Sequence, residues 1–216
     1  MGSKRDTPLM SVAFLPALFA LEGAMPPAVP IEMRETIDIA APPRAVWSVL
    51  IGSEPIGVRP GLVGQAGLAY PIGARLVGQG IGAERLGQFS TGTARERITA
   101  WPPGRRLAFV VLSQPPAMEE MSPYRRVHAP HVQRYFDTVE TSFDLQPLRN
   151  GCTRLTAHAT HVLRVDPVLY WEPVARWAIH LNVARVLSDI GAKAVKRAKT
   201  DRLGFRLNAK PFQPAG

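Results

Sequence analysis

The chain has 216 residues, of which 46% are hydrophobic, and this length favours one domain with a sizeable core. The formal net charge is +9, and the only cysteine is Cys152, which excludes an internal disulfide and fits a reducing, cytoplasmic location. The 21 prolines and 18 glycines indicate a turn-rich folded protein and exclude a low-complexity chain.

The first thirty residues are predicted to be an apolar segment followed by a linker. Lys4 and Arg5 precede the apolar run 9–21, which is too short to span a bilayer. The run fits an interfacial anchor or a helix packed on the domain, and its basic start also fits a signal peptide. A proline-rich stretch follows, so we expect residues 1–30 to precede a domain that spans 31–200.

A strand and a helix are predicted to open this domain. In ETIDIAAPPRAVWSVL, residues 35–50, apolar and polar positions alternate as far as Ile39, which is typical of a half-buried strand. Pro42 and Pro43 stop the strand because proline has no N–H to donate, and proline suits a first helical turn. Val46 and Leu50 then fall at helical spacing.

The middle of the chain is predicted to form short antiparallel strands after an irregular stretch with room for one short helix. These strands are expected at 74–77, 84–89, 93–101 and 106–112. The turn GQGIGA, residues 78–83, formally matches a dinucleotide-binding pattern, but strand residues follow it where that pattern needs a helix. We therefore interpret it as a hairpin turn, and Glu96 as an exposed strand residue.

A long loop, residues 113–130, follows the last of these strands. Long loops in compact domains are usually functional, and we expect Met118 and Tyr124 to gate a cavity. His128 and His131 in this loop have the spacing of metal ligands, but no cysteine or carboxylate cluster completes a set, so we predict no metal. His158 and His161 cannot share a metal, because strand residues three apart point to opposite faces.

Two strands with clean alternation come next, at 134–145 and 153–165, joined by a hairpin turn at Asn150-Gly151. In the first strand, the alternation predicts one face made of Tyr135, Asp137, Val139, Thr141, Phe143 and Leu145. In the second strand, it predicts that His161 points inward among small and apolar residues.

His161 and Asp137 are the candidate catalytic residues. An inward imidazole can polarise a carbonyl or move a proton, and an inward carboxylate is costly to bury unless it is paired or protonated for a task. If the two strands are hairpin neighbours, the two side chains could form an acid/base couple. The alternatives are a core histidine bonded to a neighbour and a carboxylate at a solvated rim.

A long helix is expected from Asp166-Pro167 to about Lys199, followed by a basic tail at 201–216. Its predicted apolar stripe consists of Tyr170, Val174, Trp177, Leu181 and Ala184. The cations that crowd the end of the helix fit either a solvated helix end or an anionic membrane surface. No nucleic-acid-reading motif accompanies them, so we do not expect nucleic acid as a partner.

The order of these elements indicates an α+β fold. Residues 35–50 and the motifs ITAWPPGRRLAF, APHVQRYF, GCTRLTAHATHVL and DPVLYW resemble the SRPBCC superfamily of START-like and polyketide-cyclase-like domains. The similar branch is the soluble C-terminal domain of larger bacterial membrane proteins. The resemblance implies a helix-grip fold, in which a curved antiparallel sheet wraps around a long C-terminal helix and leaves an internal cavity.

The resemblance implies two alternative functions. One is the binding of a hydrophobic small molecule or lipid, with the protein either free in the cytoplasm or peripheral at a membrane. The other is a polyketide cyclase or aromatase that works without a metal or organic cofactor, with His161 and Asp137 as its acid/base pair. In both cases the expected ligand contacts are Trp177, Tyr135, Phe143, Leu181, His180, Tyr124 and Met118.

Overall fold

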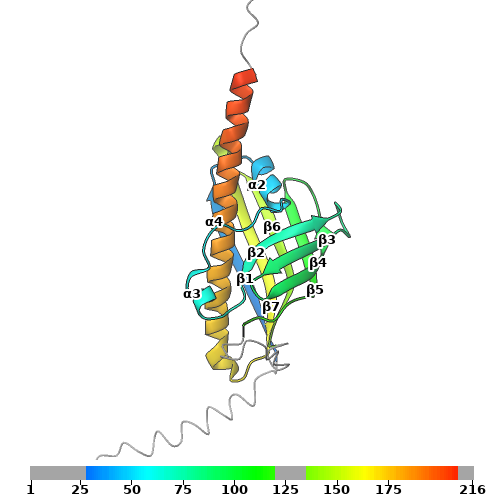
Figure 1. The fold of residues 1–216 in the computed structure, drawn as a ribbon, viewed down its shortest axis with the longest axis vertical. Helices are drawn as coiled ribbons and strands as arrows, with labels where there is room; N and C mark the ends of the chain where they lie inside the picture. The colour runs from blue at the N-terminus through cyan, green and yellow to red at the C-terminus, as the bar shows by residue number, and fades with distance from the viewer. Residues whose placement is uncertain (1–27, 120–134, 209–216) are drawn as a thin grey trace, which may run out of the picture.

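A computed structural model describes residues 28–119 and 135–208, with side chains as far as residue 202. Within these residues, seven strands form one curved antiparallel sheet in the order β1-β7-β6-β5-β4-β3-β2, and the long helix α4 packs against it (Figure 1). This is the predicted helix-grip α+β fold. The apolar run 9–21 and the loop residues Tyr124, His128 and His131 lie outside the described residues.

The first strand and helix form where the sequence predicts them. β1 (Val29–Ile39) alternates between half-buried or buried residues and exposed ones, with Ile31 and Ile39 fully inside. α2 (Pro43–Leu50) begins at the second proline of the Pro-Pro step and buries four side chains: Ala45, Val46, Trp47 and Leu50. These side chains join the main hydrophobic core between the sheet and α4.

The middle strands also match the prediction to within a few residues. The elements in this part of the chain are α3 (Gly61–Gln65), β2 (Pro71–Val77), β3 (Glu84–Phe89), β4 (Gly92–Ala100) and β5 (Arg106–Ser113). Each strand pairs antiparallel with the next, and the dinucleotide-like glycines lie in the β2–β3 turn, as the sequence predicts. No helix follows that turn.

β6 (Phe136–Pro147) and β7 (Thr153–Leu163) form the predicted hairpin. Asn150 and Gly151 both have φ of +72° in the short 3₁₀ turn η2 (Arg149–Gly151), a conformation that asparagine and glycine tolerate well. The turn therefore fixes the register of the hairpin at this end, and the two strands stay paired as far as Leu163.

A β-bulge near the start of β6 corrects one sequence prediction. Thr138 pairs with His161 and Glu140 pairs with Thr160, so Val139 is an extra residue with no partner in this register. One extra residue reverses the facing of the strand. Tyr135 and Val139 are therefore 42% and 44% exposed, whereas Phe143 and Leu145, predicted on the same face, are buried.

α4 (Val168–Asn208) contradicts the predicted apolar stripe. Its buried face consists of Val168, Ile179, Leu187, Ile190, Ala194 and Ala198. Tyr170 and Trp177, which belong to the predicted stripe, are 64% and 45% exposed. The first half of the helix is apolar on two sides, so periodicity alone does not identify the side that meets the sheet. No helix in the described residues is long and apolar enough to cross a membrane.

Candidate ligand cavity

A cavity of about 280 Å³ lies between the sheet and α4. This volume lies near the lower end of ordinary ligand sites. Most of the lining is apolar, and the apolar lining residues include Met33, Phe89, Phe109, Phe143, Val183 and Leu187. The sheet supplies most of the lining, and α4, the segment before β2 and the segment 114–117 supply most of the remainder.

His161 points into this cavity from β7, as the alternation of that strand predicts. It is 7% exposed, and its ring stacks on Phe136 with 4.9 Å between centroids. Nδ1 lies 3.0 Å from Oγ1 of Thr138, whereas Nε2 is buried and has no hydrogen-bond partner among the described residues. Burial lowers the pKa of His161 to about 4, so the ring is neutral at pH 7. A neutral ring can exchange a hydrogen bond with a ligand through Nε2.

Asp137 does not meet His161, so the predicted acid/base couple is not formed. Asp137 lies opposite Val162 in the β6–β7 register, which turns its side chain away from the face that carries His161. Its carboxylate forms an ion pair with Arg164 and accepts a hydrogen bond of 3.2 Å from the Gln114 amide. The bulge after Thr138 explains the error, because it reverses the facing that the alternation of β6 predicts.

A second polar group in the cavity wall is an ion pair between Arg85 on β3 and Glu96 on β4. Glu96 is 3% exposed, and the Arg85 guanidinium carbon lies 4.3 Å from the centroid of the Phe109 ring. Burial raises the pKa of Glu96 and outweighs the opposing attraction of Arg85. The site therefore contains a buried carboxyl group whose pKa is raised although it contacts a guanidinium.

The sequence predicts an exposed position for Glu96, and the structure shows this side chain buried. Ala94, Glu96 and Ile98 share one face of β4, and all three are buried. This alternation was the available signal, because a carboxylate between two apolar inward residues must itself point inward. Gly87 makes room for it, since a Cβ at that position would lie 2.7 Å from Oε1 of Glu96.

Asn182 on α4 is a third polar group at the cavity, and it is not among the site residues that the sequence predicts. Its Nδ2 donates a 3.1 Å hydrogen bond to the carbonyl of Ala69, which fixes the orientation of the amide. Its Oδ1 is buried and has no partner among the described residues. Asn182 and His161 are both among the residues that line the cavity, and each has one buried polar atom without a partner among the described residues.

The predicted ligand contacts divide into two groups. Phe143 lines the cavity, whereas Tyr135, Trp177, His180 and Leu181 do not. His180 lies at the surface, where its Nδ1 is 2.6 Å from a carboxylate oxygen of Glu35. Met118 is 42% exposed and forms an isolated backbone bridge with Leu68, and it does not line the cavity. The lining residues that α4 supplies come from its other side, for example Ile179, Val183 and Val186.

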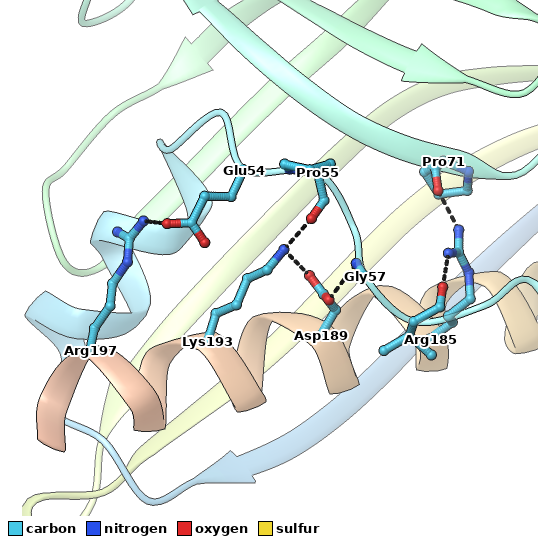
Figure 2. Close-up of polar contacts among 9 residues, drawn as sticks. Glu54, Pro55, Gly57, Pro71, Arg185, Asp189, Lys193 and Arg197 are labelled. Atoms are coloured by element: carbon cyan, nitrogen blue, oxygen red, sulfur yellow. Dashed lines mark hydrogen bonds and ion pairs between the residues drawn. The ribbon is translucent and has the colours of Figure 1, made fainter. Parts of the chain in front are cut away.

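A polar row on α4 holds one edge of the cavity in place (Figure 2). The row consists of Arg185, Asp189, Lys193 and Arg197, spaced four residues apart and thus one above another on the helix. Arg185 donates to the carbonyl oxygens of Val58, at 2.7 Å, and Pro71. Asp189 accepts a 2.9 Å hydrogen bond from the backbone N–H of Gly57.

Lys193 and Arg197, the other half of the row, bind the segment that follows α2. Nζ of Lys193 lies 2.5 Å from both the carbonyl of Pro55 and the carboxylate of Asp189, and Arg197 pairs with Glu54 at 2.5 Å. Glu54 and Pro71 both line the cavity. The row therefore ties α4 to the irregular segment that forms this side of the wall.

The described residues contain no group of three or more histidine, cysteine, aspartate or glutamate side chains that could hold a metal ion. His158 lies on the face of β7 opposite to His161, with its Nε2 3.8 Å from a carboxylate oxygen of Asp144. His161 and Glu96, the titratable groups at the cavity, can act by hydrogen bonding and proton transfer.

No protein-family model and no curated protein matches this chain. Among solved structures, Zhui aromatase/cyclase from Streptomyces sp. R1128 aligns with a TM-score of 0.52 at 15% identity, over 78% of this chain and 96% of that one. A protein from Nitrosomonas europaea aligns with a TM-score of 0.48 at 17% identity, over 79% and 97% of the two chains. Truncated norcoclaurine synthase from Thalictrum flavum aligns with a TM-score of 0.46 at 11% identity, over 76% and 92%.

At these identities the likeness shows the fold alone. The aromatase/cyclase shares the curved sheet and the long C-terminal helix, so the chain has the helix-grip fold that its sequence resemblance implies.

Proposed function

We propose that this protein binds a mostly apolar small molecule, a hydrophobic metabolite or a lipid, in the cavity between the sheet and α4. The observation that carries the proposal is an apolar cavity lined by His161 and Asn182, each of which has one buried polar atom, Nε2 and Oδ1, without a partner among the described residues. A buried polar atom without a partner costs about 1–3 kcal/mol. A ligand that supplies both partners removes this cost when it binds.

The two polar atoms also constrain the ligand. Asn182 Oδ1 can only accept a hydrogen bond, so the ligand must offer a donor at that point. His161 Nε2 donates or accepts according to its tautomer, and a hydroxyl group satisfies either form. An apolar body that carries at least one hydroxyl group therefore fits the cavity better than a pure hydrocarbon.

The test is native mass spectrometry of the full chain purified from cells, with organic extraction of whatever is bound. We expect a bound mass in the wild type, and at least about a tenfold loss of it in His161→Phe, which fills the space and removes Nε2. His180→Phe is the matched control, because it makes the same change at an exposed histidine outside the cavity. Equal occupancy in the two variants would remove the support for this site.

A second candidate function is a cyclase-like enzyme that needs no cofactor. The observation in its favour is that His161 and Glu96 line one cavity while their pKa values shift in opposite directions, down for the histidine and up for the carboxyl group. A neutral imidazole can accept a proton from a substrate, and a protonated carboxyl group can donate one to a carbonyl oxygen. Glu96 takes the role that the sequence analysis gave to Asp137.

The enzyme hypothesis predicts that the extracted molecule, or a poly-β-keto substrate, is converted by the wild type. His161→Gln and Glu96→Gln should each bind the substrate and abolish its turnover. A substrate recovered unchanged from the wild type would leave the binding function standing and reject the enzyme.

A further inference from the structure

The outward side of α4 is apolar in its first half. Tyr170, Val174 and Trp177 are 64%, 37% and 45% exposed, and their spacing places them on one stripe of the helix. Leu169 and Trp171, which are 41% and 39% exposed, flank this stripe. Single exposed apolar residues are normal in proteins, but a contiguous group of large ones marks an interaction surface.

The fold does not use this stripe. The same half of the helix packs against the sheet through Val168 and Ile179, on the other side. Figure 1 shows α4 along one side of the sheet, with its last turns extending beyond the strands. Packing within the fold therefore does not explain why the outward stripe is apolar, since solvent-facing helix positions are ordinarily polar.

The same side of α4 becomes basic toward its end. Lys199 follows Trp177 by 22 residues, which is close to six full turns, and Lys196 and Arg202 lie beside it. All three are exposed, and neither lysine has an ion-pair partner among the described residues. The cations that point toward the segment before β2, Lys193 and Arg197, are by contrast occupied (Figure 2).

We propose that the outward side of α4 docks lengthwise on an anionic lipid bilayer. Tyrosine and tryptophan rings are favoured at the boundary between headgroups and acyl chains, where one end is apolar and the other is wet. Lysine and arginine beside them are attracted to anionic headgroups. One helix side that is aromatic over its first turns and cationic over its last matches this boundary in both respects. The proposal does not depend on which ligand fills the cavity.

A bilayer explains this surface better than a protein partner. A second copy that met it side by side in parallel would place Lys196 and Lys199 against their own counterparts, where like charges repel. An anionic bilayer instead offers a partner to both parts of this helix side: the headgroup boundary contacts the aromatic rings, and the anionic headgroups attract the lysines. A flat surface also suits a straight helix that stands at one side of the sheet (Figure 1).

The experiment uses the full chain and vesicles of phosphatidylcholine with about 30% phosphatidylglycerol, compared with phosphatidylcholine alone. Brominated acyl chains quench only tryptophans that reach the bilayer. Trp171 and Trp177 are on the outward side, whereas Trp47 and Trp101 pack together inside the fold with 5.1 Å between ring centroids. We expect flotation with the anionic vesicles, quenching of part of the emission, and loss of that quenching in Trp171→Phe/Trp177→Phe.

Two double variants test whether the apolar stripe and the lysines contact the bilayer. Val174→Ser/Trp177→Ser and Lys196→Glu/Lys199→Glu should each weaken vesicle binding by at least about tenfold. The controls change exposed residues elsewhere, as Ile81→Ser and Arg97→Glu/Arg105→Glu, and they should bind as the wild type does.

Three outcomes would overturn the proposal. Flotation without quenching of Trp171 and Trp177 would assign membrane contact to another part of the chain, such as the apolar run 9–21. Equal binding to neutral and anionic vesicles would reject the role of the lysines. An absence of vesicle binding, with acrylamide unable to reach Trp177, would show that the chain itself or a second copy covers the stripe, and sedimentation would distinguish these two.

Discussion

Oγ1 of Thr138 lies 3.0 Å from Nδ1 of His161, at the step in β6 where Val139 bulges out of the β6–β7 pairing. The bulge turns Thr138 toward the cavity and Asp137 away from it. Thr138 satisfies one nitrogen of the buried imidazole, and Nε2 has no partner among the described residues. The irregularity in the strand thus determines the partner of the histidine.

Burial of His161 should appear in the pH dependence of stability. Its pKa falls from 6.5 to about 4 on folding, so the unfolded chain binds more protons between these two values. The resulting stabilisation is present above about pH 6.5 and is lost as the pH falls toward about 4, by up to about 3 kcal/mol. The free energy of unfolding, measured in urea, should therefore fall more steeply over this pH interval in the wild type than in His161→Gln. Parallel profiles would show that the histidine is not desolvated.

Gly87 should be intolerant of a side chain. A Cβ there would lie 2.7 Å from Oε1 of Glu96, so alanine must push the carboxylate away from Arg85 or bend the strand. We expect a loss of about 1–3 kcal/mol in the free energy of unfolding, as for other overpacked interiors. Gly73→Ala in β2 is the matched control, because its nearest neighbours would lie at an ordinary 3.5 Å. Equal losses in the two variants, measured by urea unfolding, would contradict the packing around Glu96.

The polar row on α4 should stabilise the segment that precedes β2. Asp189→Ala leaves the N–H of Gly57 without its acceptor and Lys193 without its carboxylate. The expected cost is about 1–3 kcal/mol, together with faster hydrogen exchange at Gly57. Asp201→Ala, an exposed acid on the same helix, serves as the control. Unchanged exchange at Gly57 would mean that the segment is held by other contacts.

The sequence predicts the elements of this fold well because their signals are local. The Pro-Pro step at Pro42 and Pro43, the turn at Asn150-Gly151 and the alternation of β7 each act within a few residues, and all three appear where expected. The inward position of His161 follows from the same alternation.

The alternation of β4 also indicates the inward position of Glu96, but the remaining site could not be predicted because it depends on contacts between distant segments. A bulge in β6 is invisible to alternation, and it separates Asp137 from His161. The side of α4 that meets the sheet is decided by the sheet, since Trp177 and Ile179 are both apolar and only Ile179 is buried. Asn182 becomes a cavity residue only because Ala69, 113 positions earlier, accepts its amide hydrogen.

The central claim is that the space between the sheet and α4 holds an apolar molecule. The most direct test is fluorescence titration of the full chain with an apolar dye, for the wild type and for Ala159→Phe. Ala159 lines the cavity from β7, and phenylalanine there projects into the space. Leu112→Phe, at an exposed position on β5, is the control. We predict saturable binding to the wild type and the control, and at least about a tenfold weaker affinity in Ala159→Phe with unfolding still cooperative. Equal affinity in all three proteins would contradict the claim.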